Sequence, residues 1–448
     1  MSSSNAPHIL FVNPWIHDFA AFDFWARPMG LVQLIAIVRS HGIKVSFVDC
    51  LNRFHPKAAN LQSKQYRYGR GAYLKTEIPK PEKLSHFPRK YSRYGIHPEW
   101  FVEDLKSIKK PDIIMITTIM TYWYPGVQET IHCIRSVFKD IPIVLGGIYV
   151  RLCFTHAKKN MDADIFVSNH GEISIFEIIS QLTGFQPTLT FNMDQLDTFP
   201  YPAWDLQPVI PFIPLLTTRG CPFRCEYCAS GYLETKIRRR SIEHVYDEIE
   251  YWYQKMGVRD FVFYDDAFLF QPDRFALPLL EKIVRKKYPI RFHTPNAIHM
   301  REITESVAQL LFAAGFINLR MGLETMDFNQ RMDQKLTFSE FETAIINLKK
   351  AGFQSKDLGA YLLIGLPGQK RELIIQSIDC VKKNGVKPIL AYYTPIPHTK
   401  LWTKAVESSP FDIAQDPLYT NNTLFPCQPD GLDWKELSEY QARAGDVP

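Results

Sequence analysis

The feature that most constrains the fold of this chain is an alternation of short apolar runs with amphipathic segments, which occurs twice along the sequence. In the first stretch, strands are predicted at His8–Asn13, 44–48, 112–117, 142–145 and 164–167, and helices at 30–41, 124–137 and 173–182. Apolar strands that alternate with helices indicate a parallel sheet covered on both faces. Such a sheet binds ligands at the carboxyl ends of its strands.

The alternation stops in a proline-rich stretch, 186–214, which predicts a linker. It restarts at Leu215, with strands predicted at 215–218, 260–265, 291–296, 317–323, 359–364 and 388–393, and helices at 241–256, 273–287, 303–314, 338–351 and 370–384. Six strands with intervening helices favour a partial barrel. The predicted fold is α/β: a doubly wound parallel sheet in 1–185, a (β/α)6 partial TIM barrel in 215–405, and an irregular C-terminal tail in 406–448.

The composition of the 448 residues, 46% apolar and 22% charged, is typical of a globular protein. No run of about 18 apolar residues occurs, so no membrane span is predicted. The first seven residues lack the basic region of a secretory signal, which favours a cytoplasmic location. The net charge of +5 is too small to imply nucleic acid by itself.

A basic insertion interrupts the first sheet at about 53–105, and its part from 53 to 93 holds eleven Lys and Arg residues against two Glu residues. One interpretation is a solvated flap at the edge of the sheet. The other is a lid that grips an anionic substrate or cofactor tail.

The strongest chemical signal is a group of three cysteines, Cys221, Cys225 and Cys228, directly after the first predicted strand of the barrel. Three thiolates on one loop favour an iron–sulfur or zinc centre, and three local ligands leave one metal position open for chemistry. A zinc site with a distant fourth ligand and a thiol–disulfide pair remain alternatives. The other cysteines, Cys50, Cys133, Cys153, Cys380 and Cys427, are too scattered for a second cluster and are predicted to be buried single thiols.

The CxxxCxxC spacing, with the aromatic Tyr227 before the last cysteine, resembles the signature of the radical S-adenosylmethionine (SAM) superfamily. The resemblance implies a (β/α)6 partial barrel whose [4Fe–4S] cluster is held by the three cysteines. It implies that SAM binds the open iron through its amino and carboxylate groups. One electron from a donor such as flavodoxin or ferredoxin then cleaves SAM to a radical that abstracts hydrogen from carbon.

Two later strand ends resemble SAM-contacting segments of the family. Asp265 and Asp266 end the second predicted strand of the barrel, where one carboxylate is expected to bind the SAM amino group. Glu324 ends the fourth strand in a segment similar to the family's "iGlES" and is expected to face the ribose or methionine end of SAM. The alternatives are helix-capping aspartates and a buried structural glutamate.

Three further positions of the barrel are candidates for cofactor or substrate contact. Gly365 and Pro367 lie in a turn that resembles the family's "iGlPge" segment, near which adenine would stack. Asn296 follows the third strand, where an amide suits the ribose hydroxyls. His398 replaces the glycine of the family's "PiPGT" segment, which puts a titratable ring near the barrel mouth.

The N-terminal half resembles the cobalamin-binding domain that precedes the barrel in one large radical SAM group. The matching stretches are 111–118, 144–147 and 170–172, and the candidate contacts in them are Thr118, Gly146, Gly147, Gly171 and Glu172. Tyr122 and Trp123 lie in an aromatic loop after the third strand, where flat rings can pack on a corrin or fill the site themselves. No D-x-H-x-x-G motif, whose histidine ligates cobalt, occurs in the chain.

With cobalamin, the resemblance implies a methyltransferase that acts on a small-molecule, lipid or peptide substrate. Without it, ring formation, C–C coupling or tRNA modification remain open. Nucleic acid is not favoured, although the basic insertion carries interleaved tyrosines at Tyr66, Tyr68, Tyr73, Tyr91 and Tyr94. A zinc-stabilised RNA-binding protein is the alternative from another class.

Overall fold

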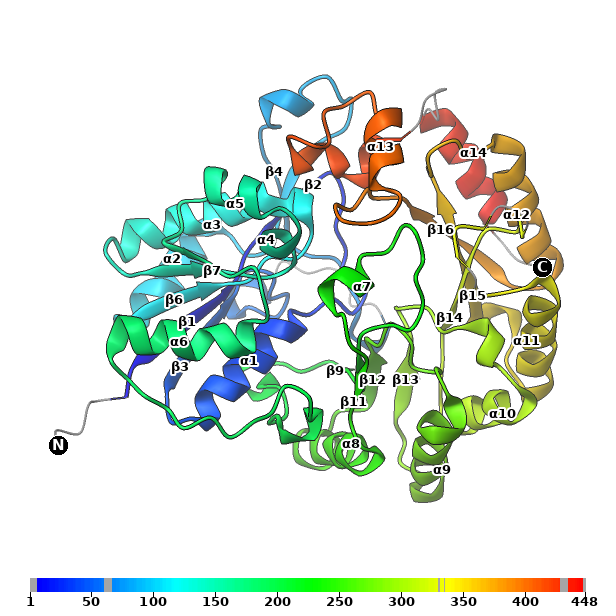
Figure 1. The fold of residues 1–448 in the computed structure, drawn as a ribbon, viewed down its shortest axis with the longest axis horizontal. Coiled ribbons are helices and arrows are strands. Elements are labelled where there is room, and N and C mark those ends of the chain that lie inside the picture. The colour runs from blue at the N-terminus through cyan, green and yellow to red at the C-terminus, as the bar shows by residue number, and fades with distance from the viewer. Residues whose placement is uncertain (1–5, 60–66, 329–330, 334, 428–433, 446–448) are drawn as a thin grey trace. The chain divides into compact units, whose positions relative to one another are not determined.

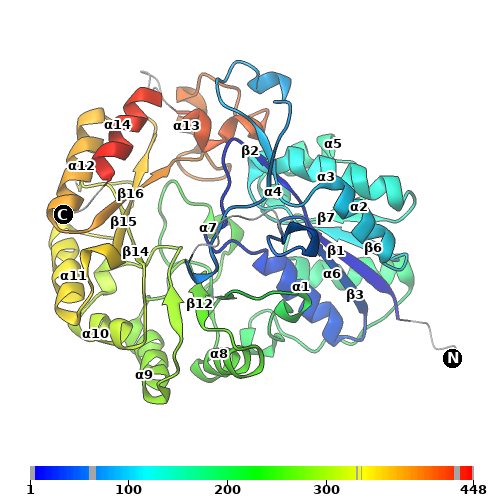
Figure 2. The same ribbon diagram turned by 180° about the vertical axis from the view of Figure 1, so that it is seen from behind.

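The computed structural model of the protein describes residues 6–59, 67–328, 331–333, 335–427 and 434–445. The chain divides into two units. In Figures 1 and 2 the ribbon is coloured by residue number from the N-terminus to the C-terminus. Unit 1 comprises Met1–Met193, Thr198–Ile210 and Gln415–Thr423, and unit 2 comprises Asp194–Asp197, Pro211–Ala414 and Leu424–Pro448.

Unit 1 is built on a five-stranded parallel sheet with the strand order β3-β1-β6-β7-β8. Its strands are β1 (His8–Asn13), β3 (Lys44–Asp49), β6 (Ile113–Ile116), β7 (Ile143–Leu145) and β8 (Ile165–Phe166). Its helices are α1 (Met29–Ser40), α2 (Pro98–Ser107), α3 (Tyr124–Val137), α4 (Ile148–Leu152), α5 (Phe154–Asn160) and α6 (Gly171–Thr183). Helices α1 and α6 lie on one side of the sheet and α2 and α3 on the other (Figure 1). The central strand β1 therefore buries both of its faces, including Leu10 and Phe11.

A small antiparallel sheet of unit 1 accounts for much of the basic insertion. Its order is β2-β5-β4, with β2 (Ile16–Asp18), β4 (Lys75–Glu77) and β5 (Ser92–Tyr94). Tyr91 and Tyr94 are buried, and their phenols donate hydrogen bonds to the carbonyl oxygens of His17 and Phe19. Tyr73 packs in the same apolar cluster as Tyr94. These three rings are therefore core residues, whereas stacking on nucleic-acid bases requires exposed rings. Tyr66 lies outside the described residues.

Five of the eleven cations of the insertion form ion pairs within unit 1. The ion pairs are Arg53 with Asp23, Lys57 with Glu103, Lys83 with Asp416, Lys90 with Glu77, and Arg93 with Glu129. Arg53 and Arg93 are nearly buried in these pairs, whereas the Lys57, Lys83 and Lys90 side chains remain 43%, 58% and 76% exposed.

The segment Gln415–Thr423 has specific contacts in unit 1, although the sequence predicts an irregular tail there. Asp416 is buried and accepts hydrogen bonds from the Tyr124 phenol and the Lys83 ammonium group. Asn421 is also buried, and its amide donates to the buried carboxylate of Asp18 at 2.8 Å. The segment thus covers the chain that follows β1 and β6, the point where the strand order reverses and where such sheets have a crevice.

Unit 2 contains two three-stranded parallel sheets, ordered β13-β12-β9 and β14-β15-β16. Their strands are β9 (Ile213–Leu215), β12 (Asp260–Phe263), β13 (Arg291–His293), β14 (Leu319–Glu324), β15 (Leu358–Ile364) and β16 (Lys387–Tyr392). Parallel bridges from Phe292 to Phe316 and from Ile298 to Met321 connect the two sheets. The six strands form one arc with helices on its outer side (Figures 1 and 2).

The helices of unit 2 follow the strands as the sequence predicts, within about three residues at each end. They are α8 (Ile242–Met256), α9 (Ala276–Lys286), α10 (Glu305–Ala313), α11 (Phe338–Ala351) and α12 (Arg371–Lys383). Two helices occur where no regular structure is predicted, α13 (Trp402–Ser408) at the start of the tail and α14 (Trp434–Ala444), which packs on α12. The predicted fold class, a doubly wound parallel sheet followed by a (β/α)6 partial barrel, is confirmed. Within the described residues, no helix is both long enough and apolar enough to cross a bilayer.

Candidate active site

The three cysteines lie on a loop whose two ends are held together by a short antiparallel pair. β10 (Thr218–Arg219) pairs with β11 (Arg238–Arg239), so residues 220–237, including α7 (Ser230–Leu233), form a closed loop at the carboxyl end of β9. Gly220 has a φ of +85°, and a Cβ there would lie 2.5 Å from the Lys236 carbonyl oxygen. Only glycine fits where the two arms of the loop approach so closely.

The cysteine side chains share this loop but differ in exposure. Cys221 and Cys225 are half-buried and Cys228 is exposed. Burial raises the pKa of the Cys221 thiol to about 11, and Asp266 and the other two thiols add to the shift, so the three sulfurs lie within electrostatic reach of one another. Among the described residues, no three His, Cys, Asp or Glu side chains are grouped closely enough to hold an ion. Three thiols on one loop are nevertheless the donor set that a [4Fe–4S] cluster with one open iron requires.

The carboxylates at the end of β12 have different surroundings. Asp265 is buried and accepts hydrogen bonds from Thr217, from its backbone N–H at 3.0 Å and from its hydroxyl at 2.5 Å. It therefore anchors the chain between β9 and β10, just before the cysteine loop. Asp266 is exposed and interacts with Ser230 of α7. Of the two, Asp266 is the one whose exposure leaves it accessible to SAM.

Asp265 also predicts a pH effect. Burial raises its pKa from 3.8 to about 6, against the opposing effect of the Thr217 hydrogen bonds. Between pH 6 and 4 the folded protein binds a proton here that the unfolded chain does not, so this group's contribution to stability increases as the pH falls through 6. We expect the unfolding free energy of the wild type, relative to Asp265→Asn, to rise by about 2–3 kcal/mol from pH 7 to pH 4. Hydrogen exchange of the β12 amides in both proteins, corrected for intrinsic exchange rates across this pH range, measures the difference within unit 2, and a pH-independent difference would contradict it.

The third and fifth strands end in locally satisfied polar groups. The Asn296 amide donates to the Tyr264 carbonyl oxygen at 2.7 Å, and the Asn296 side chain remains exposed. Gly365, with a φ of +92°, begins a turn that Gln369 closes by accepting from the Gly365 N–H at 2.8 Å, and Pro367 is buried in that turn. His398 stacks on Tyr232 of α7 with ring centroids 4.2 Å apart.

Glu324 lies at an irregularity of β14, where the pairing register with β15 shifts between Gly322 and Glu324. Its φ of +65° is rare for a residue with a side chain and marks local strain. Its carboxylate pairs with the ammonium group of Lys335 at 2.7 Å, and both side chains are nearly buried. Tyr227, inside the cysteine loop, donates its phenol to Asp333 at 3.2 Å. Neither Lys335 nor Asp333 is identified by the sequence, because they follow no motif and depend on how the chain folds back after β14.

In unit 1, the candidate cobalamin contacts fall into two groups. Tyr122 is buried, and the Trp123 indole donates to Asp18 at 2.7 Å, so both rings have packing partners within unit 1. The Thr118 hydroxyl donates to the Gly146 carbonyl oxygen, and a Cβ on Gly147 would lie 2.2 Å from the Thr118 carbonyl oxygen. Gly147, at a φ of +100°, is therefore needed for the close packing of the loops after β6 and β7.

The second group lines the carboxyl edge of β7 and β8. Gly146, Gly171 and Glu172 are half-buried there, at or near the starts of α4 and α6. Two aliphatic side chains that belong to no sequence motif, Ile148 and Ile173, are 40% and 47% exposed beside them. Their exposure next to the glycines gives this edge an apolar surface.

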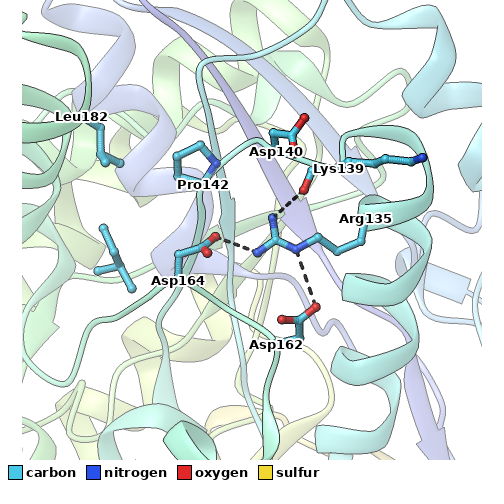
Figure 3. A pocket seen from close by; sticks show the side chains of 8 residues that line it. Arg135, Lys139, Asp140, Pro142, Asp162, Asp164 and Leu182 are labelled. Carbon is cyan, nitrogen blue, oxygen red and sulfur yellow. Dashed lines mark hydrogen bonds and ion pairs between the residues drawn. The ribbon is translucent and has the colours of Figure 1, made fainter.

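At the opposite, amino edge of these strands lies a pocket of about 380 Å³. Its lining includes Leu182 at the end of α6 and Arg135, which forms ion pairs with Asp162 and Asp164 (Figure 3). Asp164 also accepts from the Ile143 N–H at the start of β7. These contacts join α3 to the starts of β7 and β8. The charged residues that line the pocket therefore have a structural role in unit 1.

Comparisons with known proteins agree with this geometry. Residues 215–381 match the family model of the radical SAM superfamily. An uncharacterized methyltransferase of Pyrococcus horikoshii is 24% identical over 341 residues, which cover 69% of this chain and 73% of that protein. The next two curated relatives, also named methyltransferases, are covered over only 47% and 41% of their lengths.

Two solved structures share the fold across both units. TsrM from Kitasatospora setae, a radical SAM methyltransferase solved with cobalamin and a [4Fe–4S] cluster, matches with a TM-score of 0.67 at 16% identity, covering 90% of this chain and 78% of that one. The cobalamin-dependent SAM radical enzyme OxsB matches with a TM-score of 0.59 at 12% identity, covering 90% of this chain and 55% of that one. Residues 215–381 thus carry a radical SAM domain, the family whose members use the predicted [4Fe–4S] cluster and SAM. Both of these solved structures, TsrM and OxsB, contain bound cobalamin.

Proposed function

We propose that the protein is a cobalamin-dependent radical SAM methyltransferase whose substrate is a small molecule, a lipid or a peptide. The observation that carries the proposal is the apolar carboxyl edge of β7 and β8 in unit 1, where Ile148 and Ile173 are exposed, in a chain whose barrel carries a three-cysteine loop. The relatives named as methyltransferases and the fold shared with TsrM support it. A cytoplasmic location stays a prediction of the sequence.

The residues at this edge suit a corrin and its tail. Half-buried glycines, Gly146 and Gly171, allow a ligand to approach the backbone closely. The exposed Ile148 and Ile173 provide apolar contacts for a flat macrocycle. Because the chain has no D-x-H-x-x-G motif, the proposal includes no histidine ligand to cobalt from that motif.

In the barrel, the proposed division of roles follows from exposure and charge. Cys221, Cys225 and Cys228 would hold the cluster. Asp266 would accept from the SAM amino group, since its carboxylate is exposed at the end of β12. The cofactors supply a carbon-centred radical and a methyl group, and the protein's part is to hold them and to exclude solvent. An electron donor such as flavodoxin or ferredoxin would supply the electron.

For the substrate, we propose a chemical class and no individual compound. A TsrM structure contains tryptophan as substrate, which is a small molecule. The burial of Tyr73, Tyr91 and Tyr94 argues against a surface of stacking rings for nucleic acid on the basic insertion. A small-molecule, lipid or peptide substrate is therefore favoured over tRNA.

Cobalamin retention tests the proposal directly. We expect anaerobic incubation with hydroxocobalamin, followed by desalting, to leave about one corrin per chain, measured by its visible absorption. Ile173→Glu places a charge at the apolar edge and should lower the retained corrin at least several-fold, because burying an unpaired carboxylate against a macrocycle is costly.

Leu182→Glu is the matched control for this variant. Leu182 lies on the same helix, α6, and is similarly exposed at 39%, but it is at the amino edge of the sheet. Its variant should retain corrin like the wild type. Loss of corrin by the wild type on the column would overturn cobalamin binding. Equal retention of corrin by all three proteins would mean that the corrin binds elsewhere than at this edge.

A further inference from the structure

The chain that follows β14 folds back against the cysteine loop. The Met332 carbonyl oxygen accepts from the Glu226 N–H at 3.0 Å, and the Asp333 carboxylate accepts from the Tyr227 phenol at 3.2 Å. Glu226 and Tyr227 are the two residues between Cys225 and Cys228. The returning chain thus holds the part of the loop that carries two of the three thiols.

A buried ion pair fixes the returning chain in place. Arg331 and Asp333, with side chains 4% and 1% exposed, pair at 2.9 Å. Arg331 also donates to the carbonyl oxygens of Leu323 and Thr325, each at 2.9 Å. The guanidinium group therefore connects the end of β14 to the segment that contacts the cysteine loop.

Lys335 brings a positive charge to the same place. Its ammonium group lies 2.7 Å from the Glu324 carboxylate and 5.7 Å from the centre of the Tyr227 ring, and its side chain is only 11% exposed. The ammonium group thus lies against Tyr227, which stands between the predicted cluster ligands Cys225 and Cys228 in the sequence, in surroundings that screen charge weakly.

We propose that Lys335 is a positioning residue for electron transfer: its ammonium group, oriented by Glu324, sets the reduction potential of the cluster bound to the cysteine loop. Reduction adds one negative charge to a cluster whose ligands are thiolates, and a fixed cation nearby stabilises the reduced form more than the oxidised form. Cluster potentials depend on net charge, hydrogen bonds and exposure around the sulfurs. The inference rests on the radical SAM function, since it requires a cluster at Cys221, Cys225 and Cys228.

The two members of the pair should act in opposite directions. Lys335→Gln removes the cation and leaves the Glu324 carboxylate, so the reduced cluster loses stabilisation. Glu324→Gln leaves the cation without its counter-charge, so the reduced cluster gains stabilisation. A pair that served only to hold β14 to its following loop would weaken stability in both variants and would not shift the potential in opposite directions.

The test is a redox titration of the reconstituted full-length protein without SAM, in which electron paramagnetic resonance follows the reduced cluster. At the poise where half of the wild-type cluster is reduced, we expect the ratio of reduced to oxidised cluster to fall three- to tenfold in Lys335→Gln and to rise in Glu324→Gln. A tenfold change corresponds to about 59 mV for a one-electron couple. Lys335→Arg, which keeps the charge, should stay near the wild type.

Lys255→Gln is the matched control, because the Lys255 ammonium group also lies over a tyrosine ring, that of Tyr251, but on α8. It should leave the potential unchanged. Iron content and thermal midpoint are recorded for every variant. Fully loaded Lys335→Gln and Glu324→Gln proteins with wild-type potentials would overturn the inference alone. If Lys335→Gln does not hold the cluster, Glu324→Gln and Lys335→Arg decide the question. A wild type that takes up no iron would overturn the cluster assignment and the inference together.

Discussion

We expect Cys225→Ala to reduce SAM cleavage to the background rate while the protein keeps its fold. Cys225 lies in the middle of the loop that β10 and β11 close, and it is half-buried beside Tyr227. A [4Fe–4S] cluster with one iron open for SAM needs three protein thiolates. The two thiolates that remain in this variant are too few to hold it. The measurement is the amount of 5′-deoxyadenosine formed with dithionite under anaerobic conditions, together with iron content.

Cys380→Ala is the control for this prediction. Cys380 is a half-buried thiol of the same unit, on α12, and it belongs to no motif. Its variant should bind iron and cleave SAM like the wild type, which excludes a general effect of losing a thiol. A Cys225→Ala protein that keeps its iron and forms 5′-deoxyadenosine would contradict the cluster assignment itself.

Much of the fold was predictable because its central strands are continuous apolar runs. β1 has the bounds that the sequence predicts, and β15 and β16 are each predicted to within a residue. Parallel strands buried on both faces have this pattern, and it is readable without knowledge of their neighbours. The short strands β2 and β5 had no such signal. They pair across long separations in sequence, as between Asp18 and Ser92, and only the folded chain brings them together.

The C-terminal segment was missed for a related reason. Asp416 and Asn421 are polar residues in a stretch without periodicity, which predicts an exposed coil. In the structure both side chains are buried, because each also bonds its own backbone: Asp416 accepts from the Leu418 N–H and Asn421 from the Thr423 N–H. Their remaining contacts, with Tyr124 and Asp18, join residues 292 and 403 positions apart in sequence.

In the candidate active site, the sequence identified the residues that belong to motifs but not the residues that pair with them. The spacing of the cysteines is local, so the sequence contains it fully. Glu324 was identified by its position at a strand end, but its pairing with Lys335 depends on the bulge in β14 and on the returning chain that Arg331 holds. Asp265 was likewise identified by its position at a strand end, and its hydrogen bonds with Thr217 became visible only in the structure.

Asp23→Ala should strongly destabilise unit 1, with a loss of about 3–5 kcal/mol in its unfolding free energy. The Asp23 carboxylate is fully buried and accepts from Arg27 and Arg53, each at 2.8 Å, and from the Ala26 N–H. Both guanidinium groups are nearly buried as well. Removing the carboxylate leaves two cations in the interior without their counter-charge, and water cannot replace it at such a site.

Asp205→Ala is the control for this charge cluster, because the Arg39–Asp205 pair has the same chemistry but is about 40% exposed on both sides. Exposed pairs contribute about 0–1 kcal/mol, so this variant should remain near the wild type. Since the chain has two units, a single urea transition does not isolate unit 1, and hydrogen exchange of the β1 amides provides a local measure. Equal losses of protection in the two variants would mean that the cations near Asp23 find other partners or water. The buried cluster of Asp23, Arg27 and Arg53 would then contribute little to the stability of unit 1.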